Sequence, residues 1–170
     1  TVGTITEVMD YMRVLFSRAG VQHCPQCGRA INPISPQVVA DRLVMLPPGT
    51  RFQLIAPVTR NRKGDHAAAL EKARQEGFTR ARIDGEMYDL HDTKKLPRLL
   101  KSQPHTIEII VDRLVVPEPG ADAAERAAAL KDFGVRVIDS VETALHAGGG
   151  TLAVDLLDGG NLLLTEKNAC

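Results

Sequence analysis

Apolar residues near the N-terminus recur at the three- and four-residue spacing of a single helical stripe, from Ile5 to Ala19, and Gly20 marks the end of this helix. Ser35-Pro36 is typical of a helix start and predicts a second helix to about Leu46. The first helix has a full apolar face, and the chain ends at Cys170 without a stop signal. We therefore expect a segment of a larger protein that supplies the packing partners of this helix.

Apolar and polar residues alternate around Asp84-Gly85, a dipeptide typical of a two-residue hairpin turn. The flanking strands are predicted over 78–83 and 86–90. Because side chains alternate along a strand, Arg80 and Arg82 lie on the face opposite Ala81 and Ile83.

The clearest strand pattern covers residues 106–116. Simple alternation places Arg113 on the same face as the apolar residues Ile107, Ile109, Val111 and Val115. The other predicted elements are, in order, a strand over 51–58, a basic loop over 60–64, an alanine-rich helix over 65–76, a polar surface loop over 91–104, a helix over 121–133, a further helix from about Asp139 to Gly148, and a hairpin of strands 151–157 and 161–165. The mixture predicts an α+β fold, with a mixed, hairpin-rich sheet packed against several helices.

The composition limits the possible functions of the chain. It has 170 residues, of which 44% are hydrophobic, so it is long enough to bury a core. Equal numbers of basic and acidic residues, 21 each, together with 4% aromatic residues disfavour an independent nucleic-acid binder that works by charge and base stacking. The sequence contains neither a transmembrane-length apolar segment nor a signal-peptide pattern, which predicts a cytoplasmic chain with no membrane contact.

Cys24-Pro25-Gln26-Cys27 has the spacing of one zinc knuckle, in which two thiolates share a tetrahedral ion. A redox pair or two unligated cysteines are the alternatives. One knuckle supplies half of the ligands, and the sequence leaves the others open. The candidates are His23, His66, His91, His105, His146 and Cys170.

The sequence carries no pattern of an independent catalytic site. Gly148-Gly149-Gly150 lacks the Lys-Ser/Thr of a phosphate-binding loop, and Ser140 lacks the nucleophile-elbow glycines. Two sets of cations remain as candidate binding residues. The first set comprises Arg60, Arg62, Lys63 and the segment 94–101. Its two interpretations are contact with nucleic-acid phosphates and ordinary solvated loops. The second set comprises Arg80, Arg82 and Arg113, which are expected either to form a polar protein interface or simply to face solvent.

Several motifs, in order along nearly the whole chain, resemble the UvrA family, the damage-sensing ATPases of bacterial nucleotide excision repair. They are Thr1–Glu7, Asp10–Arg18, His23–Gly28, Ala56–Val58, Arg62–His66, Arg80–Glu86, His105–Glu108, Val111–Leu114 and Asp139–Leu145. The resemblance implies three parts. Residues 1–34 belong to the ATPase and signature region with the CxxC knuckle, 35–150 form a UvrB-interaction domain, and 151–170 return to the signature region at the start of a second zinc module.

The resemblance also implies functional residues and partners. Arg80 and Arg113 are expected to contact UvrB, with Arg82 as a weaker addition. Zinc is the expected cofactor, held by Cys24 and Cys27, and Cys170 corresponds to the first cysteine of the next zinc module. ATP and magnesium bind outside this segment, so the segment is not itself an enzyme, and DNA binding and homodimer formation belong to the parent protein.

Overall fold

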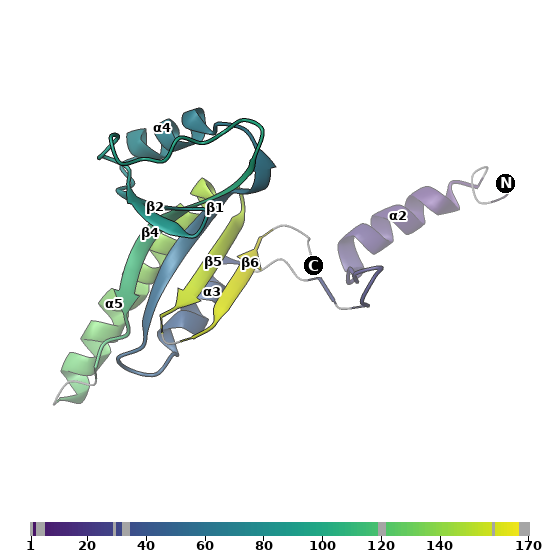
Figure 1. Cartoon of the computed structure of the whole chain (residues 1–170). Helices are drawn as coiled ribbons and strands as arrows, with labels where there is room; N and C mark the ends of the chain where they lie inside the picture. The colour runs from purple at the N-terminus through teal and green to yellow at the C-terminus, as the bar shows by residue number, and fades with distance from the viewer. Residues whose placement is uncertain are drawn as a thin grey trace. The chain divides into compact units, whose positions relative to one another are not determined.

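Six strands form one sheet in the order β3-β2-β4-β1-β5-β6, with every neighbouring pair antiparallel (Figure 1). This computed structural model describes residues 2, 6–28, 30–31, 35–118, 122–157 and 159–166. The strands are β1 (Arg51–Lys63), β2 (Arg80–Ile83), β3 (Glu86–Asp89), β4 (Pro104–Val115), β5 (Thr151–Leu156) and β6 (Asn161–Thr165). The predicted α+β class with a hairpin-rich sheet is confirmed.

The chain divides into two units. Residues 1–33 and 167–170 form the first unit, which contains helix α2 (Val8–Ala19) and the cysteine turn. Residues 34–166 form the second, with the sheet and the helices α3 (Pro36–Val44), α4 (Ala67–Gln75) and α5 (Ala123–Ala147). The second unit continues past residue 150, because β5 pairs with β1 and β6 pairs with β5. No described helix is both long enough and apolar enough to cross a membrane.

Local sequence signals explain where several elements begin and turn. The Ser35 hydroxyl accepts a hydrogen bond from the Val38 amide at 3.4 Å, and Pro36 occupies the first turn of α3. Asp84 and Gly85, with φ angles of 50° and 93°, form the tight turn between β2 and β3. Both predicted features are confirmed.

All three helices of the second unit pack on one face of the sheet. Two clusters of buried side chains lie between them and the strands, one beneath α3 and α5 and the other beneath α4. Phe52 of β1 meets Phe133 of α5 edge to face, with ring centroids 6.4 Å apart. Leu54 and Ala56 continue the same face of β1 toward the α4 cluster. Residues that alternate with these along the strands therefore point to the opposite face.

A β-bulge overturns the predicted orientation of Arg113. Leu54 lies opposite Asp112 and Ile55 lies opposite Ile110, so Val111 is an extra residue on β4. After the bulge Arg113 pairs with Gln53, between the inward-pointing Phe52 and Leu54. Arg113 therefore lies on the face opposite Ile107 and Ile109, contrary to simple alternation, because the inserted residue reverses the alternation.

Two further boundaries differ from the prediction. Residues 60–63 belong to β1 and not to a loop, since β1 continues along β4 to the pair Lys63–Pro104 with irregular register. The two helices predicted over 121–148 are one helix, α5, which runs through Gly134. A single glycine costs a helix only about 1 kcal/mol relative to alanine, and burial of Phe133, Val137 and Val141 on one side of α5 outweighs this cost.

Candidate partner-binding site

The sheet face opposite the helices carries both apolar and charged residues, and we call it the open face. Its central residues come from four neighbouring strands: Arg80 and Arg82 of β2, Glu108, Ile110 and Arg113 of β4, Gln53 and Ile55 of β1, and Ala153 and Asp155 of β5. Ile55, Ile110 and Ala153 form a small buried cluster. Charged side chains surround this apolar centre, as at polar protein interfaces.

Arg80 and Arg113 border one shallow hollow on this side of the sheet. The hollow has a volume of about 180 Å³, and its other lining residues are Met87, Tyr88 and Asp89. Both arginines are exposed, and neither side chain makes an ion pair or hydrogen bond with any described residue. The structure thus brings together two cations that are 33 positions apart in the sequence (80 and 113). Two unpaired guanidinium groups beside one hollow can bind a carboxylate.

Arg82 is held differently, although it lies only two residues from Arg80. Its Nε donates to Glu108 Oε2 at 2.7 Å, and its Nη1 lies 3.2 Å from Asp155 Oδ2. Partial burial alone would lower the pKa of Arg82, but the hydrogen bonds and negative charges of Glu108 and Asp155 outweigh this effect and raise the pKa. Gln53 Nε2 also donates to Asp155 Oδ2, at 2.9 Å. We call these four residues the Arg82 network.

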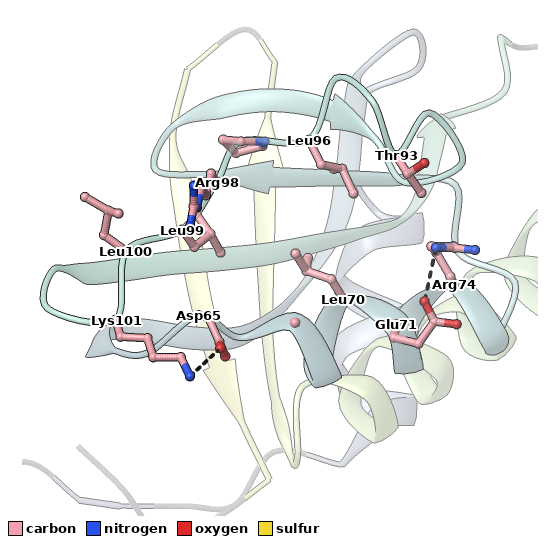
Figure 2. Close-up of a pocket in the computed structure, with 12 residues that line it drawn as sticks. Asp65, Leu70, Glu71, Arg74, Thr93, Leu96, Arg98, Leu99, Leu100 and Lys101 are labelled. Carbon is pink, nitrogen blue, oxygen red and sulfur yellow. Dashed lines mark ion pairs between the residues drawn. The ribbon is translucent and has the colours of Figure 1, made fainter.

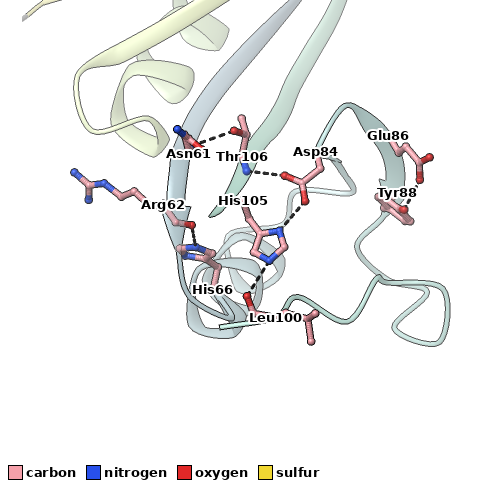
Figure 3. Close-up of polar contacts among 9 residues, drawn as sticks. All are labelled: Asn61, Arg62, His66, Asp84, Glu86, Tyr88, Leu100, His105 and Thr106. Carbon is pink, nitrogen blue, oxygen red and sulfur yellow. Dashed lines mark hydrogen bonds and ion pairs between the residues drawn. The ribbon is translucent and has the colours of Figure 1, made fainter. Parts of the chain in front are cut away.

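His105 lies on the helix side, between two hydrogen-bond acceptors (Figure 3). Its Nδ1 is 2.7 Å from Asp84 Oδ2, and its Nε2 is 3.1 Å from the Leu100 carbonyl oxygen. Because both partners accept, both bonds form only when both ring nitrogens carry protons. The hydrogen bond to Asp84 raises the pKa of His105, and the same bond lowers the pKa of Asp84. Through its contact with Leu100, the buried His105 ring ties the 91–103 segment to the start of β4.

A larger groove of about 560 Å³ lies between α4 and residues 93–101 (Figure 2). Leu70, Leu96 and Leu99 form part of its apolar lining. Ion pairs neutralise charges at its rim, with Lys101 Nζ 3.2 Å from Asp65 and Arg74 Nη1 3.1 Å from Glu71. Carboxylates inside the same unit thus already engage part of the basic segment 94–101, for which the sequence left open phosphate contact or an ordinary solvated loop.

The remaining predicted cations lie at the far end of β1. Arg60, Arg62 and Lys63 are exposed, and among the described residues no carboxylate forms an ion pair with them. The Arg62 carbonyl accepts a hydrogen bond from His66 Nε2 at 2.9 Å. These three cations could still bind phosphate, but they are separate from the hollow beside Arg80.

Cys24 and Cys27 lie on one tight turn of the first unit. The Gly28 amide donates to the Cys24 carbonyl at 2.8 Å, and Gly28 has a φ of 70°. This turn fits half of a zinc knuckle, whose ion takes four ligands. No group of three or more metal-ligating side chains was found among the described residues. Cys170 lies outside them, so zinc binding stays a prediction, with the other ligands unassigned.

Four polar residues of this region, Gln53, Asp89, Glu108 and Asp155, were not predicted from the sequence. A signal for two of them is present, because Gln53 alternates with Phe52 and Leu54, and Glu108 lies between two isoleucines. A polar residue between inward-pointing apolar residues belongs to the other face of a strand. The contact of Asp155 with Arg82 has no local signal, because it joins residues 73 positions apart.

Comparisons with known proteins agree with the position of this sheet in the chain. A family model described as the UvrA interaction domain matches residues 35–158. The chain is 46% identical to UvrABC system protein A of Streptomyces coelicolor and 43% identical to that of Mycobacterium tuberculosis, in each case over 158 residues or 93% of the chain. The identity to the Lactococcus lactis protein of the same name is 39% over 170 residues, the whole chain. The chain covers only 14%, 15% and 16% of these three relatives.

Proposed function

The chain belongs to the UvrA interaction domain family, and we propose that it is the segment through which its parent protein docks UvrB in bacterial nucleotide excision repair. Docking takes place on the open face, through Arg80 and Arg113. In this proposal the segment is a binding module. ATP turnover and DNA handling belong to other parts of the parent protein.

One observation carries the proposal, namely that Arg80 and Arg113 share a hollow and have no internal partner among the described residues. The ion pairs of the second unit satisfy other cations, among them Arg82, Lys101 and Arg136. Charged groups that a fold leaves unpaired at one exposed place are candidates for recognition. The expected partner surface therefore presents an aspartate or glutamate toward the hollow.

The chemistry of the hollow supports a carboxylate over a phosphate backbone. A volume of about 180 Å³ accommodates roughly one side chain, whereas a phosphate backbone carries a continuous series of charges. Arginine can hold a carboxylate through two parallel hydrogen bonds, which adds geometric specificity to charge. A single acidic side chain beside apolar contacts with Met87 and Tyr88 matches these features.

Nucleic-acid binding is the second candidate, based on the exposed cations Arg60, Arg62 and Lys63. Phosphate contacts of this kind depend steeply on salt and tolerate any sequence. The balanced charge of the chain and its few aromatic residues provide little support for strong independent binding.

Calorimetric titration of the chain with purified UvrB, at two salt concentrations, tests the proposal. We expect binding that weakens with salt and is lost in the double variant Arg80→Glu/Arg113→Glu. The matched control, Arg60→Glu/Arg62→Glu, makes the same change of charge at the end of β1 and should bind UvrB like the unmodified chain. Loss of binding in the control but not in the first variant would contradict the proposal. A parallel titration with duplex DNA should show weakening by the control variant if the second candidate is correct.

A further inference from the structure

The Arg82 network spans four strands of the open face. Arg82 lies on β2, Glu108 on β4, Gln53 on β1 and Asp155 on β5, and the contacts between them measure 2.7 Å to 3.2 Å. Only 21% of the Arg82 side chain, 15% of Glu108 and 23% of Asp155 is exposed. A partner approaching this face would find these charges already paired with one another.

The network directly adjoins the two arginines of the hollow. Arg80 precedes Arg82 by two residues on β2, so both side chains lie on the same face. Gln53, which holds Asp155, lies directly opposite Arg113 in the pairing of β1 with β4. Besides Asp89 in the hollow itself, Glu108 and Asp155 are the carboxylates of this face that could compete with a partner for Arg80 and Arg113 once Arg82 no longer holds them.

The side chain of Gln53 contributes to the Arg82 network although one of its own polar atoms stays unsatisfied. Its side chain is 5% exposed, and its Oε1 is buried without a hydrogen-bond partner among the described residues. Buried polar atoms without partners are uncommon in folded proteins. Gln53 is oriented to donate to Asp155, and its own acceptor stays unsatisfied.

We propose that Arg82 is a positioning residue, which neutralises Glu108 and Asp155 and thereby keeps Arg80 and Arg113 unpaired for the partner. Arg82 itself makes no contact with the partner. When the charge of Arg82 is removed, Glu108 and Asp155 attract Arg80 and Arg113. The hollow then loses the groups that bind a partner carboxylate. This inference rests on the proposed docking function, but the behaviour of the arginines in the unbound chain can be measured separately.

Removal of the Arg82 charge, with and without removal of the two carboxylates, tests the proposal in the 170-residue chain. We expect Arg82→Gln to weaken UvrB binding roughly tenfold, the size of effect typical of coupled neighbouring groups. The triple variant Arg82→Gln/Glu108→Gln/Asp155→Asn removes the competing carboxylates as well and should restore affinity to within about threefold of the unmodified chain. A direct contact of Arg82 with UvrB predicts no restoration, and that result would overturn the proposal.

Two controls keep the result interpretable. Arg74→Gln removes the same charge from the ion pair with Glu71 on α4, away from the open face, and should leave the affinity unchanged. If Arg82→Gln does not fold, the double variant Glu108→Gln/Asp155→Asn retains Arg82 and should bind UvrB at least as tightly as the unmodified chain. Weaker binding of this folded double variant, or unchanged binding of a folded Arg82→Gln chain, would refute the positioning role.

A measurement without UvrB separates this inference from the docking proposal. In NMR spectra of the unbound chain, the Nε–H groups of Arg80 and Arg113 should become more ordered in Arg82→Gln and return to their original mobility in the triple variant. If the unmodified chain fails to bind UvrB, the docking proposal is wrong, and the NMR result still decides whether Arg82 controls its neighbours. Unchanged mobility in Arg82→Gln would overturn the inference even if UvrB binds.

Discussion

The two faces of the sheet use alternate residues of the same strands, but they satisfy these residues in different ways. On the helix-covered face, Phe52 and Leu54 of β1 are fully buried against α3 and α5. On the open face, Gln53 of the same strand takes part in a network of charges, beside two arginines whose side chains have no partner among the described residues. Apolar burial is non-directional and stabilises the fold, whereas oriented charges distinguish one partner from another.

The charged residues of the two faces also differ in what they contact. Asp112 lies on the helix side and bonds Arg136 at 2.9 Å and 3.0 Å and Ser140 at 2.9 Å, all on α5. These contacts join β4 to a helix within the unit. No described helix of the second unit packs on Arg80 or Arg113, and in the proposed function they bind another molecule. Substitutions on the helix-covered face should therefore change the free energy of unfolding, and substitutions on the open face should change the affinity for the partner.

A matched pair of leucine substitutions gives the largest expected contrast. Leu54→Ala removes a fully buried side chain of the helix-covered face and should lower the free energy of unfolding by about 2–5 kcal/mol. Leu163→Ala removes a half-exposed side chain of β6 on the other face and should change it by less than about 0.5 kcal/mol. Urea denaturation measures both values, and equal losses would break the proposed division between the faces.

Arg80→Ala should show the reverse behaviour. We expect a loss of about 2 kcal/mol in the free energy of UvrB binding, as for a central charged residue of an interface. The free energy of unfolding should stay within about 0.5 kcal/mol, because the exposed Arg80 side chain makes no ion pair with a described residue. Titration and denaturation of the same sample separate the two effects. A large loss of stability with unchanged affinity would place Arg80 with the structural residues.

Asp112→Asn tests whether a charge on the helix side serves the fold. Burial alone would raise the pKa of Asp112, but hydrogen bonds from Arg136 and Ser140 outweigh it and lower the pKa. Its stabilising contribution is therefore present above the unfolded value of about 3.9 and is lost as the pH falls through the folded pKa. We expect Asp112→Asn to cost about 1 kcal/mol at pH 7, with a weaker acid dependence of stability.

The matched control for this carboxylate is Asp92→Asn, which breaks an exposed ion pair with Lys95. Such surface pairs contribute little, so its effect at pH 7 should be within about 0.5 kcal/mol. Equal effects of the two substitutions would show that the contacts with α5 add nothing beyond a surface ion pair.

His105 gives the smallest expected effect, visible in the pH dependence. Its pKa is higher in the folded chain than in the unfolded chain, so its contribution is fully present below about 6.5 and is lost as the pH rises through the folded pKa. We expect the free energy of unfolding to fall from pH 6 to pH 9, and His105→Gln to reduce this fall.

The exposed His91 provides a control for the histidine prediction, because its ring forms no comparable pair of hydrogen bonds within the described region. His91→Gln should retain the alkaline loss of stability. If His105→Gln and the unmodified chain respond identically to pH, protonation of His105 does not stabilise the fold.

Predictions from the sequence succeeded where the signal was local. The start of α3 depends on Ser35-Pro36, and the turn between β2 and β3 depends on Asp84-Gly85, so neighbouring residues suffice to predict them. The residue pattern makes Arg80, Arg82 and Arg113 candidates for a protein interface, the family resemblance singles out Arg80 and Arg113, and the structure places these two at one hollow. Their proposed partner remains to be tested by binding.

The sequence by itself determined the α+β class, the order of most elements and the alternation that separates Arg80 from Ala81, because hydrophobic periodicity and turn chemistry are local properties. Only the tertiary structure decided that Arg113 faces the open side, since the bulge at Val111 arises from the pairing of β4 with β1. It alone also decided that Arg82 pairs with Asp155, a contact between distant strands. Which charges are neutralised and which stay available depends on such long-range pairing, and no local pattern encodes it.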